Sequence, residues 1–138
     1  MSNNTPQNPR IIVIQKLYGY YLNKESTLIF PNHRYKKFIK DVVNGTIERD
    51  DLIQDVITNK LGDDINLNKT ELMLKLMIKA AIYEFMFMHK TPIKVIINEY
   101  LKVSEAFVED TQKSFLNAVL DKLSKVSRIV NEWIFNNK

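Results

Sequence analysis

Apolar residues recur along this chain at helical spacing, and few segments alternate polar and apolar residues as half-buried strands do. The clearest stripe begins at Tyr35 and continues at i+3, i+4, i+7 and i+8, where it ends at Val43. Only three glycines interrupt the pattern. We therefore expect an all-α protein that folds as a single-domain compact helical bundle of about six or seven helices.

The first predicted helix begins at Pro9 with Asn8 as its N-cap, since proline at the first helical position loses no hydrogen bond. It runs to about residue 22, and Arg10 and Lys16 take polar positions on it. Its inward face is formed by Val13, Ile14, Leu17, Tyr18 and Tyr21. Residues 23–32 are predicted to form a loop. The polar residues 1–8 are expected to be a flexible N-terminal segment ahead of one domain over 9–138.

The end of the helix that begins near Tyr35 is open to two interpretations. Gly45 is suited to a C-terminal cap, which would end the helix there. The apolar positions Ile53, Val56 and Ile57 continue roughly in phase, however, which favours one long helix that tolerates the glycine. Either way, Gly62 followed by two aspartates predicts a stop.

Three helices are predicted in the second half of the chain. Asn68 and Glu71 have capping-box spacing and open a helix that is apolar almost all round to Met88, so it should be central. Thr91 is expected to cap a helix over 92–107 that starts with a proline. The last helix should begin near residue 110 or 111 and continue from about 124 as an extension that carries Trp133.

Composition narrows the class of protein. The net charge of +4 and the sequence pI near 9.2 favour an anionic partner. Cysteine is absent, which excludes disulfides and thiolate metal sites. The N-terminus has no apolar signal-peptide core, and the longest apolar tract, 76–88, is too short to span a bilayer. We expect a soluble cytoplasmic protein.

The materials for catalysis are scarce. His33 and His89 are the only histidines, and three scattered glycines cannot form a phosphate-binding loop. The paired carboxylates at 50–51 and 63–64 are more typical of solvated faces or helix caps than of a metal site. The sequence therefore predicts a protein that is not an enzyme and has no metal and no cofactor.

Three stretches of the second half carry a specific family resemblance. They read AIYEF over 81–85, TPIKVIINE over 91–99 and KSFLNAVLDK over 113–122. In order and spacing they resemble the LYEL, PxKVxINE and KFVNGVLDK segments of the NusB family. Residues 13–18 and 38–45 are similar to the first helix and to the glycine-bearing third helix of that family. The resemblance favours a helix that continues through Gly45.

The resemblance implies a NusB-like transcription antitermination factor. Such a factor binds boxA RNA of nascent ribosomal RNA transcripts together with NusE, the small-subunit ribosomal protein, and it acts on the transcription elongation complex. A homodimer is one further option. The residues that the resemblance nominates for RNA binding are Arg10, Lys16, Lys113, Phe115, Asn117 and Lys122. Without the family, solvated lysines and core packing of Phe115 would be the default interpretation.

Four consecutive large apolar residues, 85–88, end the central helix, and a helix cannot turn all four into one interior. A surface patch that binds a partner explains them, whereas a central helix surrounded on all sides is the alternative. Candidate partner contacts here and on the next helix are Glu84, Met86, Phe87, Met88, Asn98 and Glu99. The last two, like Glu84, are equally compatible with hydrogen bonds at helix ends.

One departure from the family supports a second hypothesis. The family usually opens with an arginine-rich run, of which only Arg10 is present here. The alternative is therefore a protein-interaction module that binds NusE or another partner and has little RNA affinity of its own.

Overall fold

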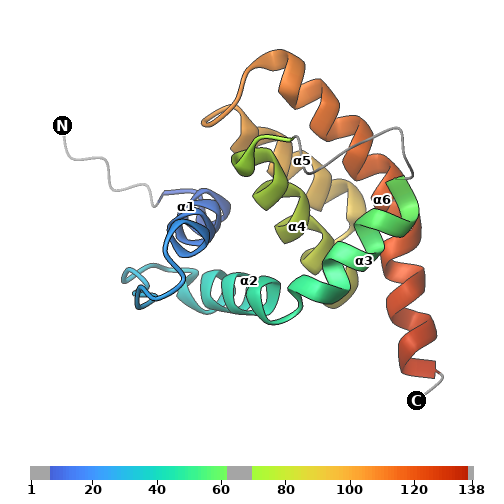
Figure 1. Ribbon diagram of the computed structural model, residues 1–138, viewed down its shortest axis with the longest axis horizontal. Coiled ribbons are helices and arrows are strands. Elements are labelled where there is room, and N and C mark those ends of the chain that lie inside the picture. The colour runs from blue at the N-terminus through green and yellow to red at the C-terminus, as the bar shows by residue number, and fades with distance from the viewer. Residues whose placement is uncertain (1–6, 62–69, 137–138) are drawn as a thin grey trace.

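The computed structural model describes residues 7–61 and 70–136, with residues 126–136 described as backbone only. The described residues form six α-helices and no strand, which confirms the all-α prediction. The helices are α1 (Pro9–Leu22), α2 (Lys36–Glu48), α3 (Asp50–Leu61), α4 (Leu72–Phe87), α5 (Ile93–Ser104) and α6 (Asp110–Asn136) (Figure 1).

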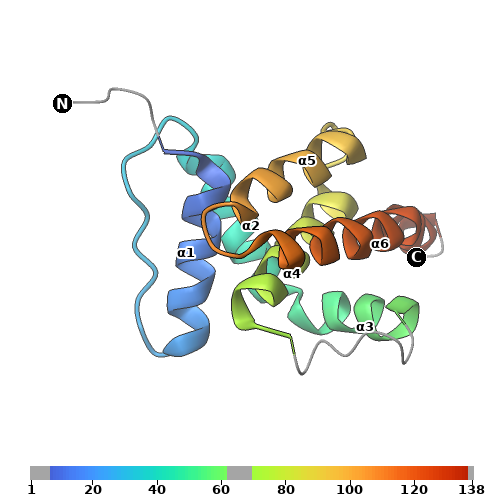
Figure 2. The same ribbon diagram turned by 90° about the horizontal axis from the view of Figure 1, so that it is seen from above.

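Helix α4 is the centre of the bundle, as its almost uniformly apolar sequence predicts. Its residues 76–86 are all buried, and it packs against each of the other five helices. The pair α1 and α2 covers one side of it, and α6 lies on the other side between α5 and α3 (Figures 1 and 2). A helix enclosed in this way leaves no polar face for solvent, so the charged residues that it carries must find partners inside the protein.

The start of α1 is built as predicted. The Asn8 side-chain oxygen accepts a hydrogen bond of 2.9 Å from the backbone N–H of Arg10, and Pro9 takes the first helical position. Residues Ile12, Val13, Ile14 and Leu17 are buried, while Tyr18 and Tyr21 are half-buried against the same core. After α1 the chain runs back along that helix, so α2 begins near the start of α1 (Figure 2).

Gly45 lies inside α2, and the reason is space. A Cβ atom at this position would overlap the ring of Tyr83 on α4, so the glycine permits the close approach of the two helices. The helix continues only to Glu48, and Arg49 separates it from α3. The prediction of a helix through Gly45 is therefore confirmed, whereas the single long helix over α2 and α3 is wrong.

Helix boundaries in the second half agree with the prediction except at α5. α4 begins at Leu72 with Glu71 as N-cap, and no side chain caps it; Asn68, the expected cap, lies outside the described residues. α5 begins at Ile93 with Pro92 as its N-cap, so the prediction that Thr91 caps it is wrong. It ends at Ser104, earlier than expected, where the backbone N–H groups of residues 105, 106 and 107 bond three residues back instead of four. The start of α6 at Asp110 is confirmed.

Candidate RNA-binding and partner-binding surfaces

Arg10 and Glu84 form a buried, two-pronged ion pair between α1 and α4. Arg10 Nε donates to Glu84 Oε2 at 2.9 Å, and Arg10 Nη2 donates to Glu84 Oε1 at 2.7 Å. The two side chains are 12% and 0% exposed. These positions correct two expectations, since Arg10 does not take a solvent-facing polar position and Glu84 is not on the surface for a partner.

The surroundings of this pair hold the arginine charged. The Arg10 guanidinium carbon lies 4.8 Å from the centre of the Phe38 ring and 5.7 Å from that of Tyr100. Burial alone would lower the pKa of Arg10, but the hydrogen bonds and charge of Glu84 raise it above its usual range. Burial, and then the Glu84 charge, raises the pKa of Tyr100 well above its usual range. The pair fastens the start of α1 to the bundle centre.

A second ion pair joins α4 to α3 and α1. The Asp50 carboxylate oxygen Oδ1 accepts hydrogen bonds of 2.7 Å from Lys79 Nζ and from the Tyr21 hydroxyl. Burial raises the pKa of Asp50, but these two hydrogen bonds outweigh it and lower the pKa below its usual value. Both charged residues within the buried stretch of α4, Lys79 and Glu84, therefore have partners on other helices.

The four α6 residues nominated for RNA are all accessible to some degree. Lys113 Nζ lies 2.5 Å from Glu105 Oε1, so its charge already has a partner. Asn117 and Lys122 are exposed, and Phe115 is half-buried against the core.

These four residues do not share one face of α6. At about 100° per residue, Lys113 and Asn117 lie about 140–180° around the axis from Phe115 and Lys122, with buried positions between the two edges. The fifth candidate, Lys16, lies on α1 in a groove of about 270 Å³ that Tyr20 also lines. One short RNA segment therefore cannot contact both edges of α6 and Lys16 on α1 at the same time.

The expected partner patch at the end of α4 is partly covered. Met86 is fully buried, which corrects its expected place on the surface, while Phe87 and Met88 are half-buried. The Arg49 guanidinium carbon lies 4.5 Å from the centre of the Phe87 ring. On α5, Asn98 is exposed and Glu99 is half-buried. The candidate residues that remain accessible to a partner therefore lie at the end of α4 and on α5.

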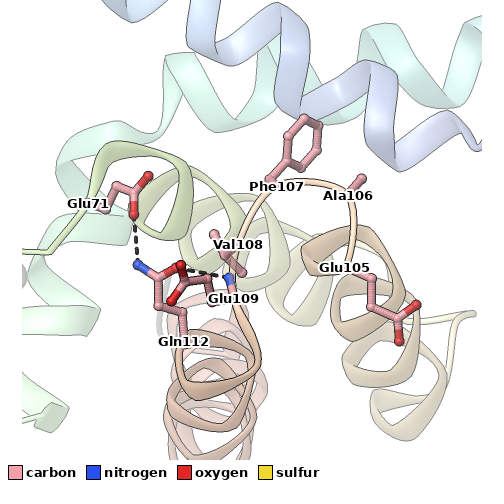
Figure 3. Close-up of a pocket in the computed structure, with 7 residues that line it drawn as sticks. All are labelled: Glu71, Glu105, Ala106, Phe107, Val108, Glu109 and Gln112. Carbon is pink, nitrogen blue, oxygen red and sulfur yellow. Dashed lines mark hydrogen bonds between the residues drawn. The ribbon is translucent and has the colours of Figure 1, made fainter.

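An acidic cleft of about 420 Å³ lies where the turn after α5 meets the starts of α4 and α6 (Figure 3). Glu71, Glu105 and Glu109 line it, and Gln112 Nε2 donates to Glu71 Oε2 at 2.7 Å. Three carboxylates repel phosphate groups, so the cleft disfavours RNA beside the first turn of α6. Glu105 also keeps the neighbouring Lys113 occupied.

A second cleft, of about 500 Å³, lies at the start of α1, beside residues that the sequence prediction missed. It is lined by Asn8, Pro9, Arg10, Tyr35, Phe38, Thr91 and Glu99. The sequence signal for it is present: residues 34–40 read RYKKFIK, in which four cations interleave with two aromatic residues. The helical stripe in the same residues predicted only core packing and concealed this second pattern.

The part of the chain that the structure describes has neither a candidate metal site nor a candidate membrane-spanning helix. Residues 7–61 and 70–125 contain no group of three His, Cys, Asp or Glu side chains placed to hold a metal ion. None of the helices described there has both the length and the apolar character to cross a membrane.

The sequence model of the NusB family matches residues 7–125 of this chain. The chain belongs to the NusB family. Among curated relatives, the transcription antitermination protein NusB of Rickettsia bellii is 30% identical over 119 residues, which cover 81% of this chain and 73% of that protein. Its counterpart in Mesorhizobium japonicum is 32% identical over 89 residues, which cover 64% of this chain and 57% of the relative.

The fold agrees with this assignment. T. maritima NusB superimposes with a TM-score of 0.75 over 91% of this chain and 94% of its own, at 20% sequence identity. The NusB match includes every candidate residue from Arg10 to Lys122, whereas residues 126–136 at the end of α6 lie beyond it.

Proposed function

We propose that this protein is a bacterial transcription antitermination factor that binds boxA RNA of nascent ribosomal RNA transcripts together with NusE. The observation that carries the proposal is the NusB family match over residues 7–125. The protein would act in the cytoplasm by binding, without catalysis, as a component of the transcription elongation complex. A homodimer is a further proposal that a measurement of mass in solution decides.

The accessible candidates suggest how the two partners would share the surface. Lys113 and Asn117 form one edge of α6 and offer a cation and a side-chain amide to RNA. Phe115 and Lys122 form the other edge, and Lys16 lies apart on α1. Phe87, Met88, Asn98 and Glu99 offer the half-buried apolar groups and polar groups typical of a protein interface. Arg10, Glu84 and Met86 would support these surfaces from beneath.

Titration of labelled boxA RNA, with and without NusE, tests the function. NusE should tighten RNA binding, and boxA RNA should tighten NusE binding by the same factor, because equilibrium coupling is reciprocal. A scrambled RNA of equal length is the control. If the protein alone bound boxA RNA as tightly as its mixture with NusE did, the proposed cooperative binding with NusE would be wrong.

The burial of Arg10 favours one alternative, a protein-interaction module with little RNA affinity of its own. The only arginine that remains of the family's N-terminal run is occupied by Glu84. On this alternative, NusE binding would be strong and unaffected by boxA RNA, and the same titration would show no RNA binding by the protein alone.

A further inference from the structure

His33 lies in the loop before α2 and uses both nitrogens of its imidazole ring. The Tyr35 backbone N–H donates to His33 Nδ1 at 2.9 Å, and His33 Nε2 lies 2.7 Å from the Gln7 carbonyl oxygen. A backbone N–H only donates and a carbonyl oxygen only accepts, so Nδ1 must be bare and Nε2 must carry a hydrogen. This is one tautomer of the neutral ring. The imidazolium carries a hydrogen on both nitrogens and therefore cannot make the bond to Tyr35.

The two bonds join the start of α2 to the residue before the N-cap of α1. Tyr35, the N-cap of α2, has no side-chain capping bond of its own. His33 takes over this role, because its carbonyl oxygen also accepts the Lys36 backbone N–H at 3.1 Å. Figure 2 shows the loop after α1 returning along that helix to this point. One histidine thus caps the turn that opens α2 and ties it to Gln7.

The charges around the ring do not favour its protonation. On its own segment, residues 26–40 contain four lysines and arginines and no acidic residue. On the α1 side the ring meets the uncharged carbonyl of Gln7, and Arg10, the charged residue at the start of that helix, is a cation paired with a buried carboxylate. On α5, Glu99 lines the cleft beside the start of α2, where its charge acts on Arg10. A positive charge on His33 would therefore add to basic surroundings.

We propose that His33 is a pH-sensitive capping residue, which holds the start of α2 on the start of α1 only while its ring is neutral. A proton added at Nδ1 turns the acceptor into a donor that faces the Tyr35 N–H, so the bond is lost and the turn before α2 opens. Histidine is the side chain whose ordinary charge change falls between about pH 5 and 8, so mild acidity is sufficient. Tyr35, which lines the cleft at the start of α1, then loses its fixed position.

The sign of the effect on stability follows from proton binding. The folded protein holds the ring neutral, whereas in the unfolded chain the ring is free to take up a proton as the pH falls. The unfolded state therefore binds more protons in this range, and the stability that His33 contributes is present at higher pH and lost towards lower pH. This prediction does not depend on RNA or NusE binding, so it stands or fails separately from the proposed function.

Thermal melting of the full chain tests the proposal with two substitutions that each copy one ring nitrogen. His33→Asn places an oxygen acceptor near the position of Nδ1, keeps the bond to Tyr35 as in an Asx turn, and does not titrate. Between about pH 8 and about pH 5, the melting temperature of the parent protein should fall by about 2–5 °C relative to His33→Asn, the effect of one hydrogen bond. His33→Gln reaches the position of Nε2 but leaves that of Nδ1 empty, so it should melt below the parent protein at the higher pH and show no such fall.

His89→Asn is the matched control, since it removes the only other histidine. It should keep the pH dependence of the parent protein. Nitrogen NMR of this variant observes the His33 ring alone and should show a hydrogen on Nε2 and none on Nδ1 at about pH 8. A hydrogen on Nδ1 under these conditions would overturn the proposal. So would a melting-temperature difference between the parent protein and His33→Asn that stays constant across the pH range. If His33→Asn does not fold, the ring spectrum of His89→Asn decides.

Discussion

Two ion pairs of this protein each join a cation to a glutamate, but their surroundings differ. Arg10 and Glu84 are enclosed between α1 and α4, whereas Lys113 and Glu105 lie 35% and 60% exposed where α6 begins. Inside the protein, each charge depends on the other because water cannot replace a missing partner. At the surface, water and salt can replace either partner at little cost. The resemblance nominated both cations for RNA, but only the surface lysine can exchange its partner for a phosphate without disturbing the fold.

The largest expected effect comes from breaking the enclosed pair. Arg10→Ala leaves Glu84 buried without a counter-charge and should lower the free energy of unfolding by about 3–5 kcal/mol, measured by urea denaturation. The double variant Arg10→Met/Glu84→Leu removes both charges and should recover much of the stability. If Arg10→Ala had nearly the same free energy of unfolding as the parent protein, the ion pair would not stabilise the fold.

Two glycines test the same contrast between interior and surface with a smaller effect. Gly45→Ala places a methyl group against the Tyr83 ring and should destabilise the protein by about 1–3 kcal/mol through overpacking. At Gly19 a Cβ meets nothing within 4 Å, so Gly19→Ala should stabilise α1 by about 0.5–1 kcal/mol. Thermal melting of the two variants gives the comparison. Shifts of the same sign would contradict the packing argument.

The smallest effect on stability is expected at the exposed pair. Glu105→Gln should leave the free energy of unfolding close to that of the parent protein, because water and salt replace the lost partner at this exposed position. It also releases Lys113, so boxA RNA should bind more tightly at low salt if this lysine contacts a phosphate. Asp55→Asn, which removes one exposed negative charge on α3, is the control. If Glu105→Gln and Asp55→Asn bound RNA with equal affinity, Lys113 would not belong to the RNA-binding surface.

Local patterns explain why the helices could be predicted from the sequence. The Asn8–Pro9 start of α1 and the almost uniformly apolar sequence of α4 each depend on residues within a few positions of one another. Apolar spacing and capping groups are readable at that range. The break at Arg49 was missed because the apolar stripe stays in phase across it.

The partners of individual charges could not be predicted in the same way. Arg10 and Glu84 are 74 positions apart in the sequence. Only the packing of α1 on α4 shows that Arg10, the one arginine of the family's basic run present here, forms a buried ion pair. The cleft at the start of α1 is a similar case. Its Tyr35 and Glu99 are brought together by three helices, although the cations and rings of residues 34–40 were visible as a pattern in the sequence.

The central place of α4 also has a consequence for biosynthesis. Helices α1, α2 and α3 leave the ribosome first, yet the apolar faces that they bury on α4 have no partner until that helix follows them out. Arg10 must likewise wait for Glu84. The nascent N-terminal half is therefore expected to stay loosely collapsed during translation, and the bundle closes only after α4 and then α6 have become available.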